Sequence, residues 1–349
     1  MIVKNEENTL PRCLKSVRDL FDEIIIVDTG STDKTKKNAS NFTNKIYDFK
    51  WINDFSAARN YAFSKATKEY VMWLDADDII KKTDYQKLKK IKKNLDKKID
   101  IVMLKYNTSF DSNGNPNFSF YRERILKREK RYQWQDPVHE YISMSGNIIK
   151  EDIAITHKSA KKEISTRNLD IYSKMKESKV KFTPRNLYYY GRELNDHGKT
   201  KEAIKILKQF LRTNEGWLED NISACIIIYH SYLKINKEQS AIEYLYKTFN
   251  YDAPRPKPAT LIGDYFQSKK KYRQAIYWYQ QAIINQNLGT DGFYEKDYGE
   301  FIPLINLVVC YDKIGEKEIA KQYHEVTKNT KPNHPSVIFN EKYFNEIKN

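Results

Sequence analysis

Three acidic residues follow an apolar segment in the first half of the chain. Residues 70–74 are apolar, and Asp75, Asp77 and Asp78 come directly after them. Because side chains alternate along an extended chain, Asp75 and Asp77 are expected to point the same way. Two carboxylates at the end of a buried strand supply hard oxygen ligands, which suit Mg²⁺ or Mn²⁺ carrying a diphosphate. Aspartates that cap a following helix would explain an isolated run of this kind equally well.

Two other segments also end in polar residues of useful chemistry. The β-branched run 23–27 is followed by Asp28 and Gly30, and the apolar start of the chain is followed by Glu6 and Glu7. Asp28 could accept hydrogen bonds from a base or a ribose, and Gly30 allows a tight turn with close backbone approach. Ligands of open α/β sheets bind beyond the carboxyl ends of the strands. The three strand ends are therefore expected to present their acids at one edge.

The elements that would position these residues alternate along the first hundred positions. Apolar periodicity and turn residues predict strands and helices whose lengths imply βαβ units and a mostly parallel sheet. The expected strands are 1–3, 23–27, 45–49, 70–74 and 99–106, and the expected helices are 10–21 and 55–66. Residues 118–157 contain short aromatic segments and turns, which suggest an antiparallel addition with long loops.

After about residue 158 the strand signals fade and helix pairs follow. A small residue recurs near the start of every second helix, at spacings of 38, 34 and 45, in Ala203, Ala241, Ala275 and Ala320. Gly191 and Gly263 each lie 12 positions before one of these alanines. Such offsets resemble the tetratricopeptide repeat, a helix–turn–helix unit of about 34 residues. We therefore predict a catalytic α/β domain over 1–160 and a tetratricopeptide-like helical repeat domain over 161–349.

Four motifs together resemble family 2 glycosyltransferases of the GT-A fold, a Rossmann-like α/β fold. They are Met-Ile-Val-Lys-Asn-Glu-Glu at 1–7, Ile-Val-Asp-Thr-Gly-Ser-Thr-Asp at 26–33, Asp-Phe-Ser-Ala-Ala-Arg-Asn at 54–60 and Leu-Asp-Ala-Asp-Asp at 74–78. With helical repeats appended, the chain is further similar to bacterial sublancin-type peptide S-glycosyltransferases. The family usually has more apolar residues before the first motif. The first strand is therefore expected to be frayed, or the start of the chain to be late.

The resemblance implies an inverting hexosyltransferase that uses a nucleotide sugar, with a UDP-sugar expected, and Mn²⁺ or Mg²⁺. Val3 with Glu6 or Glu7 would line the nucleoside pocket, and Asp28 would contact the uracil or ribose. Arg59 would lie near the diphosphate or brace Asp75, and Asp75 would reach the ribose or sugar hydroxyls. Asp77 would hold the metal. The implied donor-binding set is Val3, Glu6, Glu7, Asp28, Arg59 and Asp75.

Two later segments supply a base and a second metal ligand. The segment 134–140 resembles the Val-His-Glu segment of this group, and an inverting transferase needs a base that takes the acceptor's proton. Glu140 is the first candidate for this base and Asp136 the second. His157 ends a short strand, and a late histidine completes the metal shell in many GT-A enzymes. Imidazole suits Mn²⁺ better than Mg²⁺, but an ordinary surface histidine is an equal alternative.

Composition sets limits on the partners and the compartment. The net charge is +15, spread in short lysine runs with no arginine-rich arm, so a lysine-decorated surface explains it and nucleic acid is not expected as a partner. Three scattered cysteines predict no disulfide framework and favour a reducing compartment. The sequence opens on no signal peptide and has no apolar run of about 18 residues or more, so no transmembrane segment and a cytoplasmic enzyme are expected.

The acceptor and the rival functions remain open at this stage. The helical repeats would guide a peptide or protein acceptor, and because such repeats often pair chains, a homodimer is open as well. One alternative is a transferase that builds a cell-surface glycan, with the repeats as an assembly scaffold. A second alternative is a non-catalytic helical-repeat scaffold with a decayed sugar-nucleotide domain, against which the intact Asp28, Asp75 and Asp77 argue.

Overall fold

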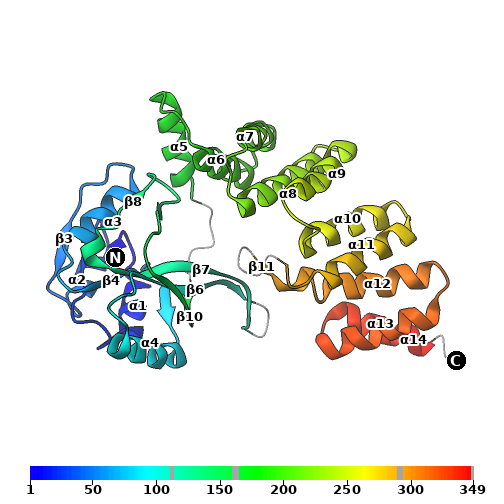
Figure 1. Cartoon of the computed structure of the whole chain (residues 1–349), viewed down its shortest axis with the longest axis horizontal. Coiled ribbons are helices and arrows are strands. Elements are labelled where there is room, and N and C mark those ends of the chain that lie inside the picture. Colours follow the sequence, from blue (N-terminus) through cyan, green and yellow to red (C-terminus); the bar gives the residue numbers. More distant parts are fainter. Residues whose placement is uncertain (111–113, 159–164, 289–293, 347–349) are drawn as a thin grey trace. The chain divides into compact units, whose positions relative to one another are not determined.

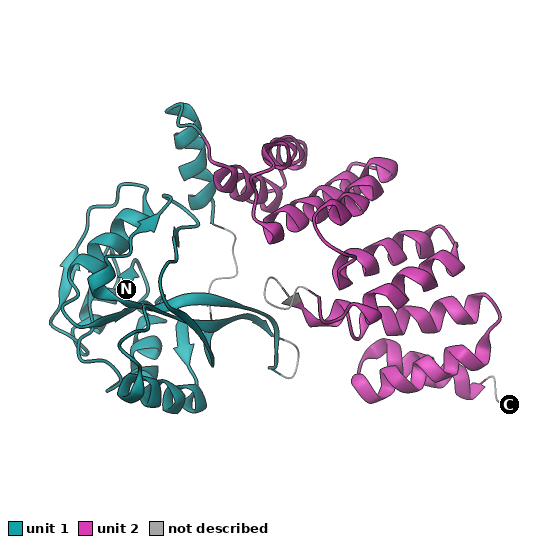
Figure 2. Ribbon diagram, in the orientation of Figure 1, with its two compact units in different colours: residues 1–181 teal, residues 182–349 magenta. Residues whose placement is uncertain are grey.

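The chain divides into two compact units, residues 1–181 and 182–349 (Figure 2). The structure is a computed structural model, and it describes residues 1–110, 114–158, 165–288 and 294–346. The division lies about twenty residues after the expected boundary at 160, because helix α5 (Arg167–Glu177) groups with the first unit. Among the described residues, no helix combines the length and the apolar character that crossing a bilayer requires.

The first unit begins with the alternation of strands and helices that the sequence predicts (Figure 1). Strands β1 (Ile2–Val3), β2 (Ile26–Asp28) and β3 (Ile46–Asp48) form a parallel sheet in the order β1-β2-β3. Register places Val3 beside Asp28, so the ends of β1 and β2 meet. The intervening helices are α1 (Leu10–Ser16), α2 (Thr35–Ala39) and α3 (Phe55–Ser64).

Strands β4, β5, β6, β7 and β10 form a mixed sheet, and β8 pairs antiparallel with β9 in a separate two-stranded sheet. The expectation of a mostly parallel sheet therefore holds for β1 to β3 and for the β6–β10 pair, and not for the other pairings. Strand β6 pairs parallel with β10 and antiparallel with β7, and β10 pairs antiparallel with β5. Strand β4 pairs antiparallel with β7. The bounds are β4 (Tyr70–Met72), β5 (Asp78–Ile80), α4 (Lys82–Asn94), β6 (Ile101–Phe110), β7 (Pro116–Lys127), η1 (Arg128–Lys130), β8 (Trp134–Gln135), β9 (Tyr141–Ile142) and β10 (Ile148–His157).

Helices α1 and α4 cover one face of this mixed sheet (Figure 1). Cys13 and Val17 from the α1 region and Leu88 from α4 pack against the strand residues Leu104 and Ile155. These side chains are at most 3% exposed. Helix α1 ends at Ser16 and not near residue 21 as expected, and positions 17–20 continue as turns whose apolar residues still enter the core.

The second unit consists of helix pairs, as the repeated alanines predict. Ala203, Ala241, Ala275 and Ala320 are all fully buried. The bounds are α6 (Pro184–Asp196), α7 (Thr200–Thr213), α8 (Leu218–Lys234), α9 (Glu238–Lys247), η2 (Thr248–Asn250), α10 (Pro256–Ser268), α11 (Tyr272–Ile284), β11 (Tyr294–Glu295), η3 (Lys296–Tyr298), α12 (Ile302–Lys313), α13 (Lys317–Thr330) and α14 (Pro335–Glu346).

The two glycines noted in the sequence lie where one helix of a pair packs directly against a side chain of the other. A Cβ atom added to Gly191 would lie 2.6 Å from Cδ2 of Leu207, and one added to Gly263 would lie 2.5 Å from Cε1 of Tyr279. Tyr279 is fully buried, and its hydroxyl donates to Asp264 at 2.7 Å. The ring therefore cannot turn away without losing this bond. Close packing of the helix pair explains the glycine at both positions.

Gly263→Ala tests this packing. Alanine favours a helix over glycine by about 0.5–1 kcal/mol, but overpacking a filled core costs about 1–3 kcal/mol. We expect the free energy of unfolding, measured by urea denaturation with circular dichroism, to fall. Ser268→Ala, at an exposed position of the same helix, should change it little. A Gly263→Ala protein as stable as the parent would contradict this explanation.

Candidate functional site

The carboxylate of Asp28 is buried at the end of β2 and half satisfied. Its Oδ1 accepts hydrogen bonds from the backbone amides of Gly30 at 2.9 Å and Ser31 at 2.8 Å. Asp28 is 2% exposed, and its Oδ2 has no hydrogen-bond partner among the described residues. Buried polar atoms are normally paired, so such an oxygen indicates a ligand or a water. Gly30 has a φ of +103°, which allows the tight turn that folds its amide back.

Glu6 and Glu7 lie in a loop that interlocks with the segment after Gly30. The Glu6 amide donates to Oγ1 of Thr35 at 2.7 Å, and the Glu7 amide donates to Asp33 at 3.1 Å. The Glu7 carboxylate accepts from the amide of Lys34 at 3.0 Å. The loops after β1 and β2 thus form one body beside Asp28. Glu7 thus bonds to this segment through both its amide and its carboxylate, while the carbonyl of Val3 accepts from the amide of Thr29 at 3.0 Å.

Asp75 and Asp77 lie on a turn between β4 and β5 and not on an extended strand, and Asp78 begins β5. Strand β4 ends at Met72, and the amide of Asp78 donates to the carbonyl of Asp75 at 3.1 Å. The alternation of side chains along a strand was expected to align Asp75 with Asp77. That reason is wrong, because the strand ends before Asp75. The turn still lies beside the first sheet, because Ala76 packs in one core cluster with Val3 and Ile26. The acids thus lie near the ends of β1 and β2.

Arg59 joins Asp75 to Glu140. Its Nη2 donates to Oδ1 of Asp75 at 2.8 Å, and its Nε donates to Oε1 of Glu140 at 2.6 Å. The guanidinium lies over the rings of Trp73 and Trp134, at 5.0 and 4.8 Å from their centroids. Burial alone would raise the pKa of Asp75, but the charge of Arg59 offsets this and lowers the pKa from 3.8 to about 2. Arg59 braces Asp75, which is one of the two predicted roles.

The rest of the 54–60 motif fixes helix α3 around Arg59. Asp54 caps the helix, with its Oδ1 accepting from the amide of Ala57 at 3.0 Å. The side chain of Asn60 both accepts from the amide of Trp134 at 2.8 Å and donates to its carbonyl at 3.0 Å. These two hydrogen bonds to the Trp134 backbone hold the 134–140 loop beside the arginine. The motif is therefore a clamp that joins two distant segments.

The loop between β8 and β9 carries both predicted bases. The structure places Glu140 against Arg59, with its side chain 13% exposed. Asp136 has a φ of +68° and His139 a φ of +54°, left-handed values that are uncommon for residues other than glycine. Non-glycine residues with a left-handed backbone cluster at functional sites, so this loop is a candidate part of the site. The His139 ring stacks on Tyr172 at 6.4 Å.

Asp77 and His157 meet, as the sequence predicts for two metal ligands. Strand β10 pairs with β5 so that His157 lies opposite Asp78. His157 Nδ1 is 3.4 Å from Oδ1 of Asp77. Hydrogen bonding to Asp77, and next to Asp78, raises the pKa of His157 from 6.5 to about 10. Asp77, Asp78 and His157 form a group that could hold a metal ion.

The donor set fits a divalent cation at two of these three residues. The side chains of Asp77 and His157 are 20% and 32% exposed, so an ion can reach them. Asp78 is fully buried, and both of its oxygens accept hydrogen bonds from protein donors. One carboxylate and one imidazole leave coordination positions for phosphate oxygens and water, and this mixed donor set favours Mn²⁺ over Mg²⁺.

Asp78 and its partner Arg124 are the main site residues that sequence reasoning missed. Arg124, on β7, donates from Nη1 to Oδ2 of Asp78 at 3.1 Å, and both side chains are fully buried. The amide of Asp75 donates to the same oxygen at 3.0 Å. The sequence signal for this pair is Arg124 itself, which is followed directly by the apolar residues Ile125 and Leu126. An arginine in a buried strand needs an acidic partner.

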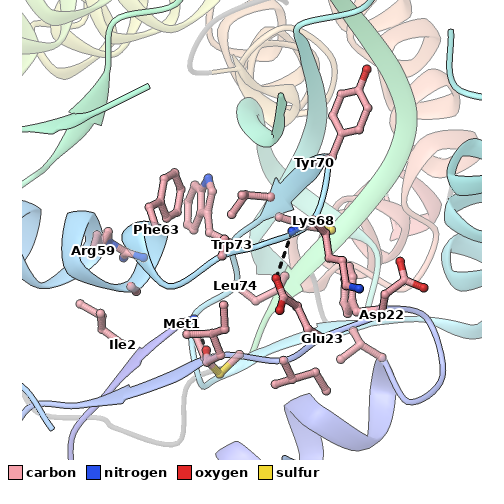
Figure 3. A pocket seen from close by; sticks show the side chains of 18 of the residues that line it. Met1, Ile2, Asp22, Glu23, Arg59, Phe63, Lys68, Tyr70, Trp73 and Leu74 are labelled. Atoms are coloured by element: carbon pink, nitrogen blue, oxygen red, sulfur yellow. Dashed lines mark hydrogen bonds between the residues drawn. The ribbon is translucent and has the colours of Figure 1, made fainter. Parts of the chain in front are cut away.

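A cavity of about 120 Å³ lies elsewhere, between β1 and β4 (Figure 3). Its lining is mainly apolar and includes Met1, Phe63 and Leu74, with Arg59 as the one predicted site residue. Strand β1 pairs with β2, and β4 pairs with β7. The cavity therefore lies between the edges of β1 and β4, which belong to different sheets and form no backbone hydrogen-bond ladder with each other. It therefore reflects this gap in strand pairing, and the acids of the site face elsewhere.

Comparisons with known proteins agree with this geometry. Residues 1–154 match the family described as Glycosyl transferase family 2. The chain is 29% identical over 221 residues to the SPbeta prophage-derived glycosyltransferase SunS of Bacillus subtilis, which covers 60% of this chain and 51% of that protein. It is 49% identical over 78 residues to a TPR repeat-containing protein of Synechococcus elongatus, covering 22% of this chain and 19% of that protein.

The solved structure of YrrB, described as a TPR protein with an unusual peptide-binding site, is similar with a TM-score of 0.39 at 17% identity, over 50% of this chain and 82% of that chain. The chain spans about half the length of SunS and a fifth of the Synechococcus protein. The matched residues 1–154 lie within the first unit and contain the four motifs, so the similarity to the family described as Glycosyl transferase family 2 concerns this unit.

Asp75→Asn tests the ion pair with Arg59. Because the folded-state pKa of Asp75 lies near 2 and its ordinary value is 3.8, the pair stabilises the fold fully above about pH 4. This stabilisation is lost as the pH falls toward 2. Between pH 4 and pH 2 the free energy of unfolding should therefore fall less in Asp75→Asn than in the parent chain, as chemical denaturation would show. An identical slope would contradict the pairing, and Asp48→Asn at an exposed position serves as the control.

Proposed function

We propose, from the premise that residues 1–154 form a glycosyl transferase family 2 domain, that the chain transfers a sugar from a nucleotide sugar to a side chain of a peptide or protein. The donor is expected to be a UDP-sugar, and transfer to require a divalent metal. The observation that carries this proposal is the meeting of Asp77 and His157, with the braced Asp75 close to Asp77 in the chain, in a unit where Asp28 keeps one unpartnered buried oxygen.

The nucleoside lies, in this proposal, over the ends of β1 and β2. The unpartnered Oδ2 of Asp28 accepts a hydrogen bond from a ribose hydroxyl or from the base. Val3 lines the pocket through its backbone, and the Glu6–Glu7 loop forms one wall. Asp75, held in one orientation by Arg59, accepts from a ribose or sugar hydroxyl. A fixed carboxylate loses no rotational freedom when it binds, which favours affinity.

Asp77 and His157 hold the metal, Mn²⁺ or Mg²⁺. When bound there, the cation supplies positive charge against the diphosphate that leaves the sugar. Asp77 and His157 are partly exposed, whereas the neighbouring Asp78 is taken up by protein donors. The chain thus offers two ligands and leaves the other coordination positions to the donor and water.

Glu140 is the proposed base, with Asp136 as the second candidate. Arg59 binds Oε1 of Glu140, which leaves Oε2 for the acceptor and fixes the carboxylate near Asp75. Glu140 takes the proton of an acceptor hydroxyl or thiol while the acceptor atom bonds to the anomeric carbon. The bond from that carbon to the diphosphate oxygen breaks at the same time, and the configuration inverts. The nucleoside diphosphate departs with the electron pair of that bond.

The helical repeats are proposed to guide the acceptor. Repeats of this kind present extended surfaces to peptides and proteins. The resemblance of the sequence to sublancin-type peptide S-glycosyltransferases favours a peptide acceptor over a lipid-linked glycan. Mass spectrometry of peptides and of lipid-linked sugars after incubation with the donor separates the two acceptor classes.

Asp77→Asn tests the metal site. Asparagine keeps the size but removes the charge that a divalent cation requires. We expect Mn²⁺-dependent hydrolysis and transfer of a UDP-sugar to fall by about 100-fold or more, because a metal ligand is lost. Asp48→Asn provides the matched control at an exposed position and should be as active as the parent. Full activity of Asp77→Asn would refute the assignment.

Asp28→Asn tests the nucleoside contact separately. Asparagine can keep the Oδ1 acceptor for Gly30 and Ser31, and it replaces the unpartnered oxygen by an NH₂ donor. A charge-assisted hydrogen bond contributes about 1.5–3 kcal/mol, so UDP affinity should fall by about 10-fold or more while the melting temperature changes little. Isothermal titration calorimetry measures the affinity. UDP binding as tight as in the parent would remove Asp28 from the pocket.

A further inference from the structure

Asp78 is the centre of a buried hydrogen-bond network next to the proposed metal site. Its Oδ2 accepts from Arg124 at 3.1 Å and from the amide of Asp75 at 3.0 Å, and its Oδ1 accepts from the hydroxyl of Tyr106 at 3.0 Å. The Tyr106 oxygen also lies 3.0 Å from Nδ1 of His157. The network therefore connects β7, β6 and the turn to the end of β10.

The hydrogen count of the tyrosine decides the direction of the last bond. A tyrosine hydroxyl has one hydrogen and can accept through its oxygen. Since Tyr106 donates that hydrogen to Asp78, its oxygen can only accept from His157. Nδ1 of His157 must then carry a proton, and in a neutral ring the lone pair lies on Nε2. The side chain that contacts Asp78 thereby selects which nitrogen of His157 can bind a metal.

Stability alone is a poor explanation for this network. A buried ion pair is often no more stabilising than apolar residues of the same volume. Arg124 is fully buried, and its Nε and Nη2 have no hydrogen-bond partner in the described part of the chain. The rings of Trp73 and Tyr106 lie 3.7 and 4.3 Å from its guanidinium carbon, which holds the arginine in one place. An arrangement that leaves donors unpaired points to a role beyond stability.

We propose that Tyr106 and Asp78, held by Arg124, are positioning residues that fix the ring of His157 beside Asp77 and set which of its nitrogens is free to bind the metal. The inference rests on the proposed function, because it deepens the Asp77–His157 site. Metal-bound histidines commonly donate their other N–H to a fixed acceptor, which sets the tautomer and the ring orientation. Here the acceptor is a tyrosine hydroxyl that is itself oriented by a buried carboxylate.

Tyr106→Phe tests the proposal, because it removes the hydroxyl and keeps the ring over Arg124. We expect Mn²⁺ to bind about 10- to 100-fold more weakly, as is usual when such a partner is lost. Titration calorimetry with Mn²⁺ in the presence of saturating UDP measures this, and a thermal melt reports on the fold. Tyr121→Phe, on the neighbouring strand β7, removes a hydroxyl that bonds to no described residue, and should bind Mn²⁺ as the parent does.

Nitrogen-15 NMR of His157 in the parent protein gives a second readout that needs no variant. With UDP and Mg²⁺ bound, Nδ1 should carry a proton, and an unprotonated Nδ1 would overturn the proposal. Parent-like Mn²⁺ affinity in a folded Tyr106→Phe protein would overturn it as well. Asp77→Asn distinguishes failure of the proposed metal site from failure of the positioning role of Tyr106. If Asp77→Asn binds Mn²⁺ normally, the metal site itself fails, whereas loss of binding in Asp77→Asn alone defeats only the role of Tyr106.

Discussion

The fork that Arg59 forms between Asp75 and Glu140 is the interaction on which the site depends. It joins residues 16 and 81 positions away from Arg59 in the chain and is enclosed by two tryptophan rings. Without the arginine, two partly buried carboxylates would lie near each other with no countercharge from Arg59, which is unfavourable. Helix α3 carries Arg59 to this position. The Asp54 cap and the hydrogen bonds of Asn60 to Trp134 hold the helix there.

The three acids after β4 have three different fates because two arginines flank them. Arg59 takes Asp75, and Arg124 takes Asp78 in a fully buried pair. Asp77 is left partly exposed beside His157. The division shows how one short run can combine internal structure with the proposed sugar recognition and the proposed metal binding, and why the spacing of the acids alone does not assign their roles.

Local signals in the sequence predicted much of this arrangement. The apolar runs at β2 and β4, the acids after them and the small residue of each helix pair are each contained in a few neighbouring residues. The turn at 75–78 was missed because its shape is set by the hydrogen bond from the Asp78 amide to the Asp75 carbonyl, and not by the alternation of side chains along a strand. The pairs Arg59–Glu140 and Arg124–Asp78 join segments dozens of positions apart, and one sequence does not say which acid each arginine meets.

A crystal structure with UDP and Mn²⁺, with the metal located by its anomalous scattering, tests the central claim most directly. The claim is that Asp28, Asp75, Asp77 and His157 form one donor site. We expect a single strong anomalous peak bounded by the carboxylate of Asp77 and the imidazole of His157, with the nucleoside against Asp28. A nucleotide bound at another surface, or a manganese ion away from Asp77, would contradict it.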